Sequence, residues 1–154
     1  MANFLTNRRK YIVGVTDMSA STFRMMLLTT QFTSNDALNT VDDGTTSDPL
    51  SYEIAVGGYS RQSIGYSAFE DDANDFAGLD HADVTFASLA AGTTIGWAAV
   101  YRYSTSGSPN TTSDTGQDFL WAYNLTATPT NGGNIVIQMG STTAGGAVKI
   151  GSTS

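Results

Sequence analysis

The only histidine of the chain is the residue best suited to acid–base chemistry, and acids lie on both sides of it. His81 stands in the segment LDHAD, between Asp80 and Asp83. A hydrolase of the Ser-His-Asp type needs a serine nucleophile, and the sequence contains no GxSxG motif to present one. We therefore interpret His81 as a surface residue in an acidic loop. No catalytic residue is assigned, and the chain is not expected to be an enzyme.

Metal chemistry would need clustered oxygen ligands, and these are concentrated in one acidic segment, residues 67–83. Six of the 14 acidic residues lie there. Calcium prefers carboxylate and amide oxygens, which the segment supplies at Asp71, Asp72, Asn74 and Asp75. Their spacing does not match the EF-hand loop, with its glycine at the sixth position and glutamate at the twelfth. We prefer a solvated acidic loop, keep calcium as the alternative, and assign neither a metal site nor a cofactor.

Aromatic side chains suggest a third chemistry, the stacking of sugars. They alternate along residues 95–103 (IGWAAVYRY) and 119–126 (FLWAYNLT). Alternating aromatics on neighbouring strands gather on one face, which is more often a core than a platform. We prefer the core and keep a carbohydrate-binding module as an alternative, with the stacking residues Trp97, Tyr101, Trp121 and Tyr123.

The composition favours a β-rich protein that works by contact. The chain has 154 residues, a net charge of −7 and no cysteine, which excludes disulfides and thiolate metal sites. It contains 22 Thr, 16 Ser and 16 Gly, or 54 of 154 residues. Only 14% of residues are charged, against about 25% in a typical domain. The acidic charge argues against nucleic acid as a partner, and no apolar run approaches a membrane span.

Short apolar runs separated by turn residues predict an all-β fold. Residues 3–10 are expected to form one or two helical turns, and residues 33–50 a long polar connection. The predicted strands are Tyr11–Thr16, Phe23–Thr30, Ser51–Val56, Tyr59–Tyr66, Val84–Ala87, Ile95–Tyr103, Phe119–Thr126, Asn134–Met139 and Ala147–Ile150. For Tyr11–Thr16 the alternative is a continuation of the first helix. This pattern indicates an antiparallel β-sandwich or a jelly-roll-like barrel with a short N-terminal arm.

The two aromatic runs predict an antiparallel hairpin with a long polar tip, residues 104–118. Loops of this length without structure of their own are uncommon in compact domains and are often functional. We interpret the tip as a surface contact loop, with the contact residues Ser108, Asn110, Thr112 and Asp114.

Basic residues are concentrated near the N-terminus. Arg8, Arg9 and Lys10 are three of the seven basic residues in the chain. The planar guanidinium of arginine bonds a carboxylate at two points. The segment is therefore expected to dock on an acidic protein surface.

The opening MANFLTNR, followed by Lys10, resembles the N-termini of small virion proteins of tailed bacteriophages. The layout of the rest of the chain also resembles these proteins, in the segments GGYSRQSIGY (57–66), DVTF (83–86) and GWAAVY (96–101). Such proteins are structural components of the head, neck or tail, and they include cement proteins that decorate the capsid lattice, many of them as trimers. The resemblance implies a structural role in the virion and leaves the site on the particle open. The preferred hypothesis is a cement protein on the capsid exterior, with the major capsid protein and further copies of itself, as a homotrimer, for partners.

The preferred hypothesis divides the chain into a basic docking arm, residues 1–10, and a single β domain, residues 11–154. Repetition on a lattice would multiply weak contacts between arm and shell. The residues expected to dock on the capsid are Phe4, Leu5, Arg8, Arg9, Lys10 and Tyr11. A phage tail, collar or fibre component that contacts the host through residues 104–118 is the alternative.

Overall fold

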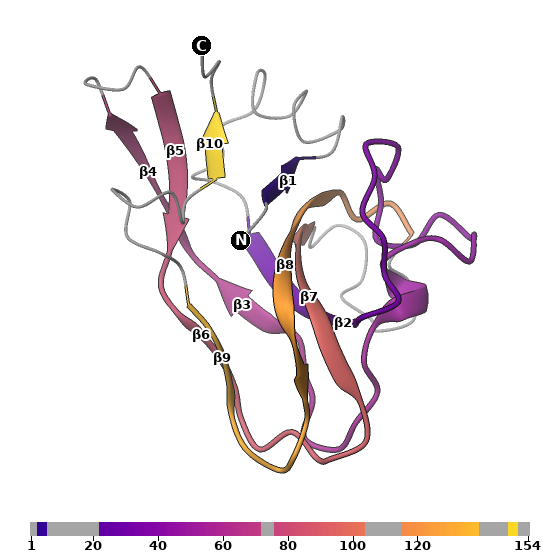
Figure 1. The fold of residues 1–154 in the computed structure, drawn as a ribbon. Helices are drawn as coiled ribbons and strands as arrows, with labels where there is room; N and C mark the ends of the chain where they lie inside the picture. Colours follow the sequence, from indigo (N-terminus) through magenta and orange to yellow (C-terminus); the bar gives the residue numbers. More distant parts are fainter. Residues whose placement is uncertain (1–2, 6–21, 72–75, 104–114, 139–147, 151–154) are drawn as a thin grey trace.

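Antiparallel β-sheets make up nearly all of the regular secondary structure in the residues that the structure describes (Figure 1). The computed structural model describes residues 3–5, 22–71, 76–103, 115–138 and 148–150. Within these ranges the strands are interrupted by one short 3-10 helix, η2 (Leu50–Tyr52). The sheets lie in two layers, as in a β-sandwich, and do not close into a barrel. The predicted all-β sandwich is confirmed, and the barrel alternative is wrong.

The larger layer is a five-stranded sheet in the order β1-β8-β7-β2-β3, with every strand antiparallel to its neighbours. Its strands are β1 (Asn3–Leu5), β8 (Phe119–Pro129), β7 (Thr94–Tyr103), β2 (Thr22–Thr29) and β3 (Gln62–Ile64). β7 and β8 form the hairpin that the two aromatic runs predict. The strand predicted over Phe23–Thr30 is likewise confirmed as β2.

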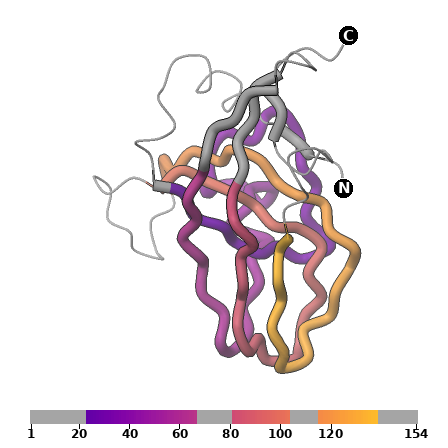
Figure 2. Tube along the Cα trace, turned by 90° about the vertical axis from the view of Figure 1, so that its left-hand side faces the viewer, coloured from indigo at the N-terminus to yellow at the C-terminus, as the bar shows by residue number. Residues whose placement is uncertain are grey.

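The second layer is built from the two smaller sheets. One has the order β10-β5-β4, and the other pairs β6 with β9. The strands are β4 (Tyr66–Asp71), β5 (Phe76–His81), β6 (Val84–Phe86), β9 (Ile135–Ile137) and β10 (Val148–Ile150). Gly65 alone separates β3 from β4, and residues 82–83 separate β5 from β6. The β4–β5 hairpin therefore forks at its base, where β3 joins the large sheet and β6 joins β9. Figure 2 shows β3, β6 and β9 from a second side.

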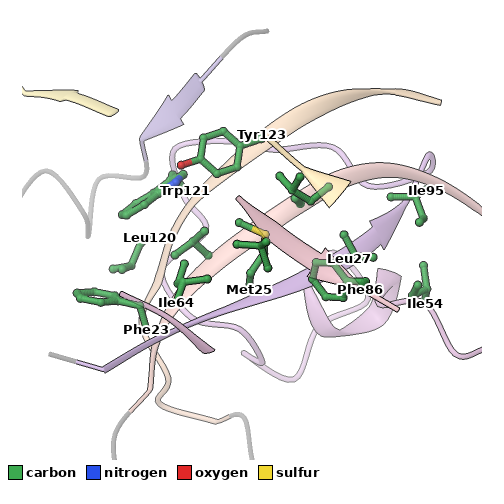
Figure 3. Packing of buried hydrophobic residues seen from close by; sticks show 14 of the residues in the cluster. Phe23, Met25, Leu27, Ile54, Ile64, Phe86, Ile95, Leu120, Trp121 and Tyr123 are labelled. Atoms are coloured by element: carbon green, nitrogen blue, oxygen red, sulfur yellow. The ribbon is translucent and has the colours of Figure 1, made fainter. Parts of the chain in front are cut away.

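Both faces of the large sheet are buried, which explains why its central strands are apolar throughout. On β2, Phe23, Met25 and Leu27 point into the core between the layers, whereas Met26 and Leu28 point to the opposite face. A strand that is covered on both sides reads as a continuous apolar run rather than an alternating one. The core between the layers also contains Ile54, Ile64, Phe86, Ile95, Leu120, Trp121 and Tyr123 (Figure 3).

Residues 30–53 cover the second face of the large sheet. Val41 fixes this cover: its N–H donates to the Gln117 carbonyl at 2.9 Å, and its carbonyl accepts from the Leu50 N–H at 3.0 Å. The polar connection predicted over residues 33–50 is therefore a folded layer over the sheet. The buried apolar residues of this cover include Phe32, Leu38 and Val41.

The strand predicted over Ser51–Val56 is wrong. The ring of Pro49 fixes φ near the helical value, and η2 begins directly after it. The Asp48 carboxylate accepts a hydrogen bond from the Ser51 N–H at 2.8 Å, which stabilises this turn. A single bridge at Glu53 then joins the segment to β2.

Two irregularities in the β7–β8 ladder redirect side chains that simple alternation assigns to one face. The first lies at Gly96, where a Cβ would approach the neighbouring backbone to 2.7 Å. As a result Ile95 lies in the core between the layers, while Trp97 packs on the opposite face. The second shift divides Phe119 from Trp121 in the same way.

The beginning of the chain is a strand rather than a helix. Asn3–Leu5 pair with β8, so the helical turns predicted for residues 3–10 are wrong over residues 3–5. A sheet edge offers backbone partners to a short segment, whereas an isolated helix of this length is marginal. Residues 6–10 and the strand predicted over Tyr11–Thr16 lie outside the described residues. The division into an arm and a domain stays a prediction.

Candidate functional site

The histidine lies inside the sandwich. His81 is 5% exposed, and its ring packs edge-on against Tyr66 at 5.3 Å and Tyr123 at 6.0 Å between centroids. Its Nδ1 is 2.7 Å from the carbonyl oxygen of Ala82, and its Nε2 is 3.4 Å from the Tyr123 hydroxyl. Because a carbonyl only accepts, Nδ1 carries the hydrogen in this contact. The interpretation of His81 as a surface residue is wrong: it forms the last pair of the β4–β5 ladder with Tyr66.

The acidic segment is a β-hairpin rather than a loop. β4 and β5 pair in register from Tyr66 opposite His81 to Asp71 opposite Phe76. The calcium alternative falls on the tip of this hairpin, and residues 72–75 lie outside the described residues. In the part of the chain that the structure describes, no group of three or more His, Asp or Glu side chains is placed to hold a metal ion.

The aromatic residues of β7 and β8 belong to the core, as predicted. Trp121 and Tyr123 are 0% exposed, and Tyr101 is 1% exposed. Trp97 is half-buried and packs edge-on against Phe32 at 5.5 Å. The rings of Tyr101, Trp121 and Tyr123 therefore offer no open stacking face of the kind that a carbohydrate-binding platform requires.

A polar groove lies in the fork between β3 and β6. It has a volume of about 180 Å³ and is lined by residues 62–65 and 82–85. Its polar side chains are those of Gln62, Ser63, Asp83 and Thr85. Pockets for organic ligands usually measure about 300–1,000 Å³, so the groove is too small to support a substrate site.

In the residues that the structure describes, Arg61 and Glu53 form a two-point ion pair that was not predicted from the sequence. Arg61 donates from Nε to Glu53 Oε1 at 2.7 Å and from Nη2 to Glu53 Oε2 at 2.5 Å. Its Nη1 donates to the Tyr101 hydroxyl at 3.2 Å. The Tyr59 hydroxyl donates to Glu53 Oε1 at 2.6 Å and accepts from the Leu27 N–H at 3.1 Å. A Glu and an Arg eight residues apart give no sequence signal, because the turn at 57–58 brings them together.

This cluster is shielded from water. The side chains of Arg61 and Glu53 are 10% and 14% exposed. Burial raises the pKa of Tyr59 well above its usual value, and the negative charge of Glu53 and its hydrogen bond raise that pKa further. The groups bond to one another and to the β2 backbone, so the cluster fastens residues 53–61 to the large sheet.

The residues predicted to dock or to contact a surface are only partly described. Phe4 and Leu5 lie in β1, opposite Ala122 and Trp121 of β8. The other docking residues, Arg8, Arg9, Lys10 and Tyr11, lie outside the described residues, as do the loop residues Ser108, Asn110, Thr112 and Asp114.

Two further findings bear on function. Of the residues described, none belongs to a helix that is long and apolar enough to cross a membrane. No protein-family model, curated protein or solved structure matches the chain.

Proposed function

We propose that the protein is a structural component of a bacteriophage virion, which binds the outside of the capsid lattice. One observation carries the proposal: the residues best suited to chemistry are used for packing. His81, Trp121 and Tyr123 lie in the same core, and each contacts another member of the group. The outer part of β8 instead exposes small uncharged residues, Asn124, Thr126 and Ala127. Such a surface suits association by shape and hydrogen bonding.

The position of β1 supports a docking role for the basic residues that follow it. β1 is paired to the large sheet and ends at Leu5. Arg8 comes three residues later, and an extended chain reaches about 3.4 Å per residue. The basic group Arg8–Lys10 is thus held within a short reach of the sandwich. Short tethering reduces the entropy lost when such a group binds.

Substitution of the basic group tests the proposal without disturbing β1. Deleting residues 2–10 would also remove an edge strand, so a loss of binding could reflect unfolding. The triple variant Arg8→Ala, Arg9→Ala, Lys10→Ala keeps β1. We expect it to fold normally and to lose co-sedimentation with capsid shells that lack the protein.

A matched variant separates charge from geometry. Arg8→Lys with Arg9→Lys keeps the charge but removes the planar forks that bind carboxylates at two points. The double lysine variant is expected to bind capsid shells more weakly than wild type and more strongly than the triple alanine variant. Its binding is expected to weaken as the salt concentration rises. Full binding by the triple alanine variant would remove the basic group from the proposal.

A further inference from the structure

We infer that the groove between β3 and β6 binds one arginine side chain, presented on an extended segment of a partner protein. The groove has a volume of about 180 Å³. This volume corresponds to about six water molecules at about 30 Å³ each. A guanidinium group with the end of its stem has about as many non-hydrogen atoms. The groove is therefore large enough for one long basic side chain, although it is smaller than the usual pocket for an organic ligand.

The floor of the groove is apolar and its rim is polar. Ile64 and Val84 line the groove and are buried members of the core between the layers. Their neighbours Ser63 and Thr85 are exposed, because successive side chains of a strand point to opposite faces. An arginine buries its methylene stem on apolar surface and keeps its charged end among polar groups, which matches this arrangement.

The polar side chains of the groove offer oxygen atoms to a donor. Asp83 contributes a carboxylate, and Ser63 and Thr85 contribute hydroxyls. The Gln62 amide nitrogen donates to the carbonyl and hydroxyl oxygens of Ser60, at 2.8 and 3.1 Å, so the other end of this amide, Oε1, is an acceptor. Arginine has five N–H donors, whereas lysine has three. Acceptors spread over two strands therefore favour the broad guanidinium over the compact ammonium.

The strands beside the groove also have backbone edges that no strand covers. Among the strands that the structure describes, β3 pairs only with β2, and β6 pairs only with β9. Such an edge can bond to an extended segment, which adds to it as a further strand. A partner segment that pairs with either edge holds one of its side chains at the groove.

Charge supports a basic partner. The chain has a net charge of −7, and a negative field raises the rate at which a positively charged segment associates. Among the described residues, no Lys or Arg lines the groove. The groove itself therefore presents no positive charge that would repel such a segment.

A peptide titration tests the inference. The probe is the peptide Thr-Val-Arg-Val-Thr with blocked ends, and the control peptide replaces its arginine with citrulline, which has a similar shape and no charge. In nuclear magnetic resonance spectra of isotope-labelled protein, the arginine peptide is expected to shift the amide signals of residues 62–65 and 82–85. The citrulline peptide is expected to bind about tenfold more weakly, because hydrogen bonds to charged groups are the stronger ones.

Two variants separate the charge of the groove from its shape. Asp83→Asn is expected to weaken binding of the arginine peptide about tenfold. Asp43→Asn removes the same charge outside the groove and should leave binding unchanged. Gly65→Val should block the groove without strain, since Gly65 has no positive φ and a Cβ there would meet nothing within 4 Å. Asp83 is exposed, so Asp83→Asn is expected to fold normally.

Three outcomes would overturn the inference. The first is the absence of shifts at millimolar arginine peptide, and the second is equal binding of the arginine and citrulline peptides. The third is a shift of the same amide signals when the protein alone is concentrated, which would assign the groove to a second copy of the chain. The assay contains no capsid, so its result is independent of the proposed function.

Discussion

Arg61 and Glu53 form a two-point ion pair at the edge of the large sheet, with N–O distances of 2.7 and 2.5 Å. Both side chains are largely buried. When one partner of such a pair is removed, the other is left as a buried charge without compensation. The contact helps to attach residues 54–60 to β2, together with the hydrogen bonds that Leu27 makes with the Ile54 N–H and the Tyr59 hydroxyl.

Removing one partner of the pair should therefore destabilise the fold. Arg61→Leu is expected to lower the free energy of unfolding by about 3 kcal/mol. The double variant Arg61→Leu, Glu53→Leu should be less destabilised than Arg61→Leu alone, because no lone charge remains. Urea unfolding of wild type, both single variants and the double variant measures the coupling. Additive effects of the two substitutions would contradict this account.

Tyr59 should make the protein sensitive to alkali. Its pKa is raised in the fold, mainly by burial and then by Glu53, so the fold favours the neutral phenol. The resulting stability is complete below the unfolded pKa of about 10 and is lost as pH rises above it, by up to about 1.4 kcal/mol per pH unit.

Tyr59→Phe isolates this effect. At pH 7 the variant should be less stable by about 1–3 kcal/mol, because the buried Leu27 N–H loses its acceptor. Above pH 10 the difference between wild type and variant should shrink. Urea unfolding at a series of pH values measures both stabilities, and a constant difference across the series would refute the assignment.

Phe32 should be essential to the cover over the second face of the sheet. Its ring packs against Tyr52, Trp97 and Phe119, with centroids 5.8, 5.5 and 6.2 Å away. Phe32→Ala is expected to cost about 3–5 kcal/mol. Val136→Ala is the control, since Val136 is 45% exposed and its truncation should change stability little. If the two variants unfold at the same urea concentration, residues 30–53 are not a folded cover.

Gly58 and Gly44 offer a matched test of backbone strain and crowding. Both have positive φ, +81° and +78°. A Cβ at Gly58 would lie 2.5 Å from the Ser88 carbonyl oxygen, whereas a Cβ at Gly44 would meet nothing within 4 Å. Gly44→Ala should cost about 1 kcal/mol from the left-handed conformation alone. Gly58→Ala should cost clearly more, and equal thermal shifts in the two variants would argue against the close packing of this turn.

The strands were predictable where local pattern and burial agree. The run Phe23–Thr30 and the two aromatic runs are long and apolar, and each forms a strand in the large sheet. The failures have tertiary causes. The alternation of β7 breaks at Gly96, where Thr30 approaches the backbone closely, and no local pattern reveals that approach. Residues 30–53 look like a polar loop because their few apolar residues are widely spaced along the chain.

The candidate site was less predictable than the fold. His81 has acidic neighbours in sequence, yet strand pairing turns it toward Tyr66 and Tyr123. The Glu53–Arg61 pair depends on a turn between two segments that the sequence assigns to strands. The contact between His81 and Tyr123 joins residues distant in the chain, whereas Glu53 and Arg61 lie eight residues apart and meet only because the chain turns between them.

Electron cryomicroscopy of virions tests most directly the proposal that the protein coats the capsid exterior. Particles from wild type are compared with particles that carry a tagged copy of the chain. We predict density for a small β-sandwich repeated over the whole outer surface of the shell, with the tag label at the same positions. Label confined to a tail, collar or single vertex, or virions without the protein, would contradict the claim.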